Sequence, residues 1–246
     1  MDRMLYVAMT GAKETLRAQT VNNHNLANVS TTGFRADLAA FQSRAVDGSG
    51  YASRVYATNS SIGWDKSVGA MLSTGRDLDV AINGPGWIAV QGPDGKEAYT
   101  RAGDLQVDPT GQLTTANGRP VLGDSGPINI PPYTSIFVAR DGSISLVAQG
   151  QTPDATSTVG RIKLVNPPDD QVERGDDGLF RMKDGSVAPA DSTVQLGSGE
   201  LESSNVNAAE AMVNMIELAR QFEMQVKAIK AADENGSVAS QLLRMG

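Results

Sequence analysis

The first 28 residues carry a regular row of mainly apolar positions. The spacing alternates between four and three residues, and the row consists of Leu5, Met9, Ala12, Leu16, Gln19, Asn23 and Leu26. This heptad-like spacing, in a stretch without proline, predicts one amphipathic helix over residues 1–28 with two polar interruptions in its stripe.

The C-terminal segment contains a second and stronger row of this kind. Its members recur every three or four positions, at Met212, Met215, Ala219, Phe222, Val226 and Ile229. Asn207 followed by Glu210 matches a capping box, in which the Asn side chain accepts a hydrogen bond from the first turn. The pattern predicts a C-terminal helix within residues 201–246 that begins near Asn207. Gly236 costs about 1 kcal/mol relative to Ala in a helix, so the last turns are expected to bend or fray.

Between these segments the pattern changes to short runs of β-branched and aromatic residues, such as DLDVAI, WIAV, SISLV and RIKLV. Turn signals separate the runs, among them Asn83-Gly84, Asp94-Gly95, Asn117-Gly118 and Asp141-Gly142. Short strands joined by such turns indicate antiparallel meanders or a partly closed barrel over residues 71–200. Residues 29–70 are rich in Ser, Gly, Ala and Thr with little periodicity, which predicts an extended connector with room for one hairpin.

Together these patterns predict a mainly β protein with terminal α-helices. Helical stability comes mainly from packing of the apolar face, so each terminal stripe needs a partner. The two helices are therefore expected to form a coiled-coil-like pair that orders on assembly with neighbouring copies. The residues expected to pack there are Leu5, Met9, Leu16, Met212, Met215, Ala219, Phe222, Val226 and Ile229.

Composition removes several classes of partner. The net charge is −7 and the Lys and Arg residues are scattered. Nucleic acid and anionic membranes require clustered positive charge, so neither is expected as a partner. No apolar run is long enough to span a bilayer, and the N-terminus lacks the uninterrupted apolar core of a cleavable signal peptide. The chain has no cysteine, which excludes disulfides and thiolate metal sites.

Residues suited to catalysis are few. His24 is the only histidine, and without a nucleophile pattern a polar or interface role is favoured over acid–base chemistry. Glycoside hydrolysis needs two carboxylates across a cleft, whereas Asp77/Asp79, Asp169/Asp170 and Asp176/Asp177 are neighbours in turns. The segment DDQVERGDDG, residues 169–178, lacks the alternating ligand spacing of a calcium loop. No catalytic residue, metal site or cofactor is predicted.

Two motifs at opposite ends of the chain resemble signatures of the bacterial flagellar rod and hook proteins. NLANVSTTGF, residues 25–34, is similar to the N-terminal signature, and GELESSNVNAAEAMVNMIELARQFEMQVKAIKAADEN, residues 199–235, looks like the closing helix. The stretches YTRAGDLQVDPTGQL, GRIKLV and RGDDGLFR are similar to those of proximal-rod members. The resemblance covers nearly the whole chain and is least diagnostic over residues 42–70.

This resemblance implies a structural subunit rather than an enzyme. Members of the family are exported through the flagellar type III export apparatus without signal cleavage and assemble helically in the periplasm. They form the hollow rod of the basal body, which transmits torque from the motor to the hook. The implied partners are copies of the same chain, other proximal and distal rod proteins, and the export apparatus.

The resemblance also marks an assembly motif of Asn25, Leu26, Ala27, Asn28, Thr31, Gly33 and Phe34. We expect the amides of Asn25 and Asn28 to satisfy backbone groups at the helix end, and Gly33 to permit a turn that other residues resist. Two alternatives stay open: a distal-rod or hook-like axial subunit, and an exported carbohydrate-active or calcium-binding β protein.

Overall fold

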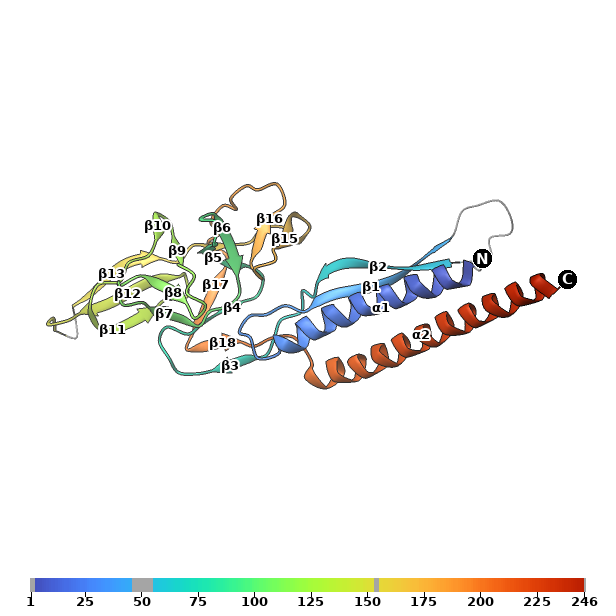
Figure 1. Ribbon diagram of the computed structural model, residues 1–246. Helices are drawn as coiled ribbons and strands as arrows, with labels where there is room; N and C mark the ends of the chain where they lie inside the picture. Colours follow the sequence, from blue (N-terminus) through green and yellow to red (C-terminus); the bar gives the residue numbers. More distant parts are fainter. Residues whose placement is uncertain (1–2, 46–54, 153–154, 246) are drawn as a thin grey trace. The chain divides into compact units, whose positions relative to one another are not determined.

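The computed structural model describes residues 3–45, 55–152 and 155–245. The chain forms two compact units (Figure 1). The helical unit comprises Met1–Val29, Ala36–Asp65 and Val206–Gly246, and the β unit comprises Ser30–Arg35 and Lys66–Asn205. The chain therefore passes from one unit to the other four times, after Val29, Arg35, Asp65 and Asn205.

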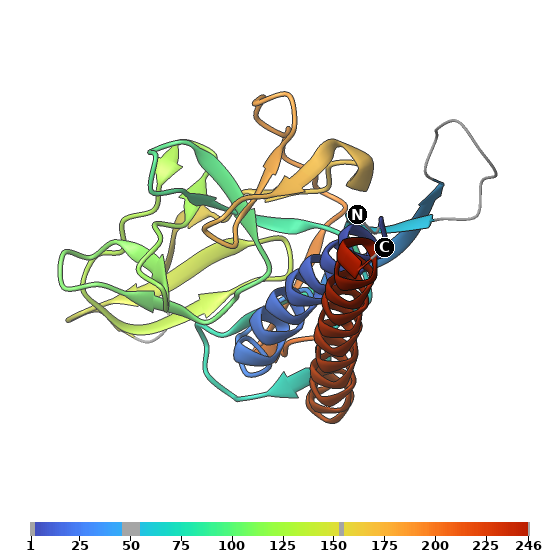
Figure 2. The ribbon, with the colours of Figure 1, turned by 45° about the vertical axis from the view of Figure 1, so that its right-hand side comes forward.

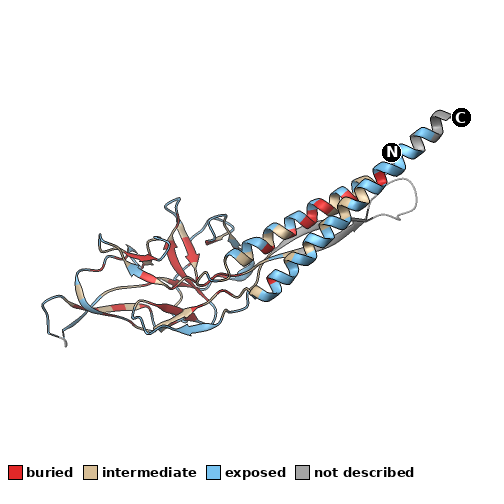
Figure 3. Ribbon diagram, turned by 60° about the horizontal axis from the view of Figure 1, so that its bottom comes forward, coloured by how far each residue is buried: buried red, intermediate tan, exposed pale blue. Residues whose placement is uncertain are grey.

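The helical unit consists of two long helices and a hairpin. Helices α1 (Arg3–Ala27) and α2 (Ala208–Met245) lie side by side and antiparallel (Figures 1 and 2). The antiparallel hairpin of β1 (Asp37–Ala45) and β2 (Val55–Trp64) also packs against α1. Because α1 has both α2 and the hairpin as neighbours, it carries most of the buried helical positions (Figure 3).

Small residues make up much of the buried face of α1. The positions recur every three or four residues, at Ala8, Ala12, Thr15, Ala18 and Asn22. The approach of α2 is close, since a Cβ added to Gly11 would come within 3.0 Å of the Gln225 side-chain amide. The larger residues of the expected stripe are less enclosed: Met9 and Leu16 remain 51% and 47% exposed, and Leu5 is partly buried.

Helix α2 begins where the capping pattern predicts. Asn207 Oδ1 accepts hydrogen bonds from the N–H groups of Ala209 (3.0 Å) and Glu210 (3.3 Å). The helix continues through Gly236 to Met245. Its buried or partly buried positions include a row at heptad spacing, namely Ala211, Met215, Leu218, Phe222, Gln225, Ile229 and Ala232. Val226 is also partly buried, whereas Met212 and Ala219 are exposed.

The β unit contains the remaining described strands and a short 3-10 helix, Asp169–Gln171. In chain order its strands are β3 (Met71–Ser73), β4 (Val80–Asn83), β5 (Trp87–Gln91), β6 (Glu97–Thr100), β7 (Leu105–Val107), β8 (Leu113–Thr115), β9 (Leu122–Gly123), β10 (Gly126–Pro127), β11 (Tyr133–Val138), β12 (Ser143–Ala148), β13 (Thr156–Arg161), β14 (Leu164–Val165), β15 (Val172–Arg174), β16 (Phe180–Met182), β17 (Gln195–Ser198) and β18 (Glu200–Glu202).

The named strands of the described chain pair only in antiparallel fashion. A five-stranded sheet has the order β14-β5-β6-β16-β15, and a three-stranded sheet has the order β11-β12-β13. The two-stranded pairs of this unit are β3 with β18, β4 with β17, β7 with β8, and β9 with β10. One core, which includes the fully buried Ile88, Leu113 and Ile144, joins the five-stranded and three-stranded sheets with the β4–β17 and β7–β8 pairs. The prediction of a mainly β protein with terminal helices and antiparallel strands is confirmed.

The element boundaries differ in detail from those expected. The expected connector, residues 29–70, is divided: β1 and β2 pair within the helical unit, and residues 30–35 and 66–70 belong to the β unit. Residues 46–54 of that connector lie outside the described residues. The C-terminal helix starts at Ala208, because strand β18 and an extended segment occupy residues 200–207.

Candidate functional site

The first half of the Asn25–Phe34 motif lies at the end of α1. Asn25 Oδ1 accepts a hydrogen bond from the N–H of Asp37 (2.8 Å), and its Nδ2 donates to the carbonyl oxygen of the same residue (2.9 Å). The side-chain amide thus supplies the donor and the acceptor that a neighbouring strand would otherwise supply to Asp37. This double contact holds the first residue of β1 at the last turn of α1.

Asn28 and His24 complete the contacts at this helix end. Asn28 Nδ2 donates to the carbonyl oxygen of His24 (2.9 Å), which also accepts from the N–H of Asn28 (3.2 Å). His24 Nδ1 lies 2.7 Å from the Asp37 carboxylate. The hydrogen bonds agree with the expectation that Asn25 and Asn28 satisfy backbone groups. Of the other motif residues, Leu26 and Thr31 are partly buried and Ala27 is exposed.

The second half of the motif belongs to the β unit. Gly33 has a φ of +66°, and a Cβ added to it would lie 2.3 Å from the carbonyl carbon of Arg101. Its N–H donates to the carbonyl oxygen of Glu202 (2.8 Å). Glycine is therefore required here for two reasons: the left-handed backbone conformation and the closeness of another backbone.

Phe34 is buried beneath a guanidinium group. The Arg174 Cζ atom lies 4.4 Å from the centre of the Phe34 ring, within the range of a cation–π contact. Arg174 Nη1 also donates to the carbonyl oxygen of Arg35 (2.9 Å). One side chain of β15 thus fixes both the ring and the backbone that follows Gly33.

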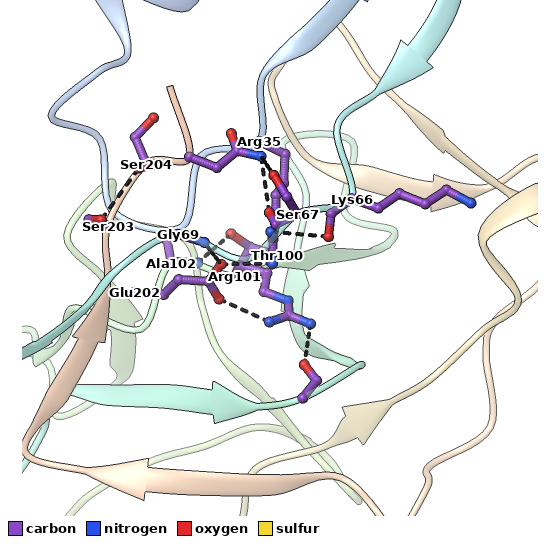
Figure 4. Close-up of polar contacts among 12 residues, drawn as sticks. Arg35, Lys66, Ser67, Gly69, Thr100, Arg101, Ala102, Glu202, Ser203 and Ser204 are labelled. Atoms are coloured by element: carbon purple, nitrogen blue, oxygen red, sulfur yellow. Dashed lines mark hydrogen bonds and ion pairs between the residues drawn. The ribbon is translucent and has the colours of Figure 1, made fainter. Parts of the chain in front are cut away.

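A buried cluster of two arginines and one glutamate lies directly after the motif (Figure 4). Arg35 Nη2 contacts Glu202 Oε1 at 2.7 Å, and Arg101 Nη1 contacts Glu202 Oε2 at 2.9 Å. The three residues are only 2%, 5% and 1% exposed, for Arg35, Arg101 and Glu202. One carboxylate therefore pairs with two guanidinium groups away from water, where an unpaired charge is very costly.

Backbone groups add further hydrogen bonds to this cluster. The N–H of Gly69 donates to Glu202 Oε1 (3.1 Å), and Arg101 Nη2 donates to the carbonyl oxygen of Gly84 (2.6 Å). Arg35 Nη1 donates to the carbonyl oxygen of Lys66 (3.4 Å). The cluster thus joins chain segments that are distant in sequence.

The carboxylate pairs considered for catalysis have structural contacts. Thr74 Oγ1 donates to the buried Asp79 carboxylate (2.6 Å), and Lys66 lies 3.0 Å from Asp169. Arg181 donates to both oxygens of Asp177 (2.8 and 2.6 Å), and this contact holds the pKa of the Asp177 carboxyl below its ordinary value. Among the described residues, no group of three or more His, Cys, Asp or Glu side chains is arranged to hold a metal ion.

The residues of the buried cluster were not singled out from the sequence. Arg35 follows Gly33-Phe34 directly, and Arg101 and Glu202 occur within YTRAGD and ELESSN. A charged residue inside each of three family-like motifs was a usable signal, but the motifs themselves do not indicate that these residues meet.

Both segments of the chain and the chain as a whole are similar to known flagellar rod and hook proteins. Residues 198–242 match the model "Flagellar basal body rod FlgEFG protein C-terminal", and residues 81–146 match "Flagellar hook protein FlgE/F/G D1 domain". The flagellar basal-body rod proteins FlgF of Salmonella typhimurium and Escherichia coli are 47% and 48% identical, with 100% of each chain covered. The rod protein FlgG of Buchnera aphidicola subsp. Schizaphis graminum is 36% identical over 97% of this chain and 98% of its own.

Within the described parts of the chain, no helix combines the length and the apolar character needed to cross a bilayer.

Proposed function

The chain belongs to the family of FlgF-type flagellar basal-body rod proteins, and from this premise we propose how it assembles. It is a structural subunit of the flagellar basal-body rod. The identity of 47–48% over full length to two FlgF proteins is the observation that carries this conclusion. Both of these FlgF proteins align over the full length of this chain and of their own, and on that identity we assign the subunit to the proximal rod.

The finer features of this function are part of the proposal. The subunit is exported through the flagellar type III apparatus without signal cleavage and joins the rod within the periplasm. There it assembles helically with its own copies and with other rod proteins into a hollow shaft that transmits torque from motor to hook. It has a mechanical role and no catalytic one.

Within the subunit, α1 and α2 act as a coiled-coil-like pair. The heptad spacing of Ala211, Met215, Leu218, Phe222 and Ile229 supports this arrangement. Asn22 Nδ2 donates to the carbonyl oxygen of Ala211 (2.8 Å) in a buried position, and a buried polar contact of this kind fixes the register of a helix pair.

Contacts between subunits then use the outer sides of the same helices. On α2, Met212, Val213 and Ile216 are 54%, 55% and 55% exposed. At 3.6 residues per turn Val213 and Ile216 lie nearly opposite the inward row of α2, and Met212 lies at its flank. Tyr6, Met9 and Leu16 form a similar exposed row on α1. We call these six residues the outer stripe. Helical assembly needs one patch that meets a different patch on the next copy, and the outer stripe supplies apolar surface for such contacts.

The Asn25–Phe34 motif contributes indirectly. Its described contacts fix the end of α1 and the turn that enters the β unit. Its role in assembly is to hold the stripe-bearing helix in a defined conformation.

The variant Ile216→Asp tests the outer stripe. A carboxylate at this position is solvated in the free subunit, but it must lose its water in a packed contact between subunits. We expect a folded protein that fails to restore motility and is absent from isolated basal bodies. Asn214→Asp, an exposed charge two positions away, is the matched control and should assemble. Normal incorporation of Ile216→Asp would refute the proposal that the outer stripe forms contacts between subunits. Met215 and Phe222 are less suitable targets, because a charge there also disturbs the pairing of α1 with α2.

The position along the shaft is tested separately. Deletion of the gene should arrest rod growth before the proximal rod is complete. Arrest only after its completion would assign the chain to the distal alternative.

A further inference from the structure

Three of the four places where the chain passes between its units are flanked by segments of the β unit that meet at Glu202. These passage segments are residues 33–35, 66–70 and 202–205. The first precedes the passage after Arg35, the second follows the passage after Asp65, and the third precedes the passage after Asn205. We propose that Glu202 links the three segments so that they unfold locally only together. None of them can then leave the β unit alone.

Every pair of passage segments is directly bonded. The first and third are joined by the N–H of Gly33 to the carbonyl of Glu202 (2.8 Å) and by the N–H of Asn205 to the carbonyl of Phe34 (3.3 Å). The ion pair of Arg35 with Glu202 adds a third link between the same segments.

The second segment is bonded to both of the others. The N–H of Gly69 donates to the Glu202 carboxylate (3.1 Å), and the N–H of Ser203 donates to the carbonyl of Ala70 (2.8 Å). Asn205 Nδ2 donates to the carbonyl of Ser67 (3.0 Å), and Arg35 Nη1 donates to the carbonyl of Lys66. The three segments therefore form a closed ring of contacts.

The buried charges make the opening of the three passage segments cooperative. If any one segment leaves, either Glu202 or a guanidinium group loses a partner while it is still enclosed by the other two. Removing one partner of a buried ion pair is strongly destabilising. Release of all three segments together keeps Arg35 paired with Glu202, so that only the ion pair of Arg101 with Glu202 is broken, and this is the lowest-energy opening.

The consequence for a shaft subunit rests on the proposed function. A force that reaches the β unit through the chain at one passage would be shared among three segments instead of peeling one of them away. The cooperativity itself is a property of the isolated chain and can be measured without any rod.

Hydrogen exchange of the purified full-length wild-type chain in increasing, sub-denaturing urea tests the proposal. The amides of Gly33, Gly69, Ser203 and Asn205, each the donor of a bond in the ring, should share one opening free energy and one urea dependence. Separate values for the three segments would overturn the proposal, and this measurement needs no variant to fold.

A variant then tests whether Glu202 is the residue responsible. Glu202→Gln should accelerate exchange in all three segments by roughly a hundredfold, as expected when a buried pair loses its charge. Glu97→Gln is the matched control, because it makes the same change in a largely buried ion pair of the β unit, with Lys163 at 2.8 Å. It should leave exchange in the passage segments unchanged. Faster exchange at Gly69 alone, or equally faster exchange in the control variant, would show that Glu202 does not link the three segments. Failure of Ile216→Asp to disturb assembly would affect the proposed function and not this result.

Discussion

The Asn25 side chain pairs with the Asp37 backbone through both its oxygen and its nitrogen, at 2.8 and 2.9 Å. Asn25→Asp keeps the shape but replaces the donor with a carboxylate oxygen that faces the Asp37 carbonyl. We expect a loss of about 1–3 kcal/mol in the free energy of unfolding, measured by urea denaturation. Asn23→Asp, at an exposed position on the same helix, should cost much less. Equal losses would mean that the double contact contributes little.

Gly33 should tolerate substitution much less well than another glycine with a similar backbone. Gly118 has a φ of +70°, and a Cβ there would meet nothing within 4 Å. Gly118→Ala should therefore lower the free energy of unfolding only by the cost of placing alanine in the left-handed conformation, about 1–2 kcal/mol. Gly33→Ala adds the clash with Arg101 and should cost about 1–3 kcal/mol more. Comparison of the two unfolding free energies isolates the clash, and similar values would contradict it.

Tyr99 should ionise later than an exposed tyrosine. Burial raises the pKa of its phenol to about 12, although the N–H of Ala188 donates to its oxygen at 2.7 Å. The folded pKa is above the unfolded value of about 10. The contribution to stability is therefore complete below about pH 10 and is lost as the pH rises through the folded pKa. Phenolate absorbance should show a late step that Tyr99→Phe removes and that Tyr6→Phe, at an exposed position, leaves in place.

Asp177 should contribute to sensitivity at low pH. Its hydrogen bonds with Arg181 lower the pKa of its carboxyl below the ordinary value. A lowered folded pKa means that the contribution is present above the unfolded pKa and is lost as the pH falls through the folded pKa. Asp177→Asn should reduce the unfolding free energy at neutral pH and flatten its decline below about pH 4. Asp176→Asn, at an exposed neighbouring position, is the control. An unchanged acid profile for Asp177→Asn would rule out this contribution.

Features whose determinants lie within a few residues could be predicted from the sequence. The start of α2 depends on Asn207 and the two N–H groups that follow it, and the end of α1 depends on Asn28 and the preceding turn. Turn signals such as Asn117-Gly118 likewise located the connections of the β unit, because glycine with positive φ is needed at those points.

The inward face of α1 could not be predicted in the same way. Periodicity gives the spacing of a row, but two rows of similar spacing run along this helix. Ranking by apolar size favours Met9 and Leu16, whereas the close approach of two neighbours selects Ala8, Ala12 and Ala18. The helix therefore carries Met9 and Leu16 on its exposed side.

The Glu202 cluster was beyond sequence reasoning for a different reason. Arg35, Arg101 and Glu202 come from three separate parts of the chain and meet only in the folded β unit. Charged residues are rarely buried unless paired, so each alone reads as a surface residue.

The two faces of α1 also differ in how freely they can evolve. Enlarging Ala8, Ala12 or Ala18 would overpack the subunit, so selection for folding alone restrains these positions in every descendant. Tyr6, Met9 and Leu16 are outside that restraint and can change together with a new neighbour. Gene duplication could thus yield paralogues with the same architecture and different places in a shaft, distinguished by one side of one helix.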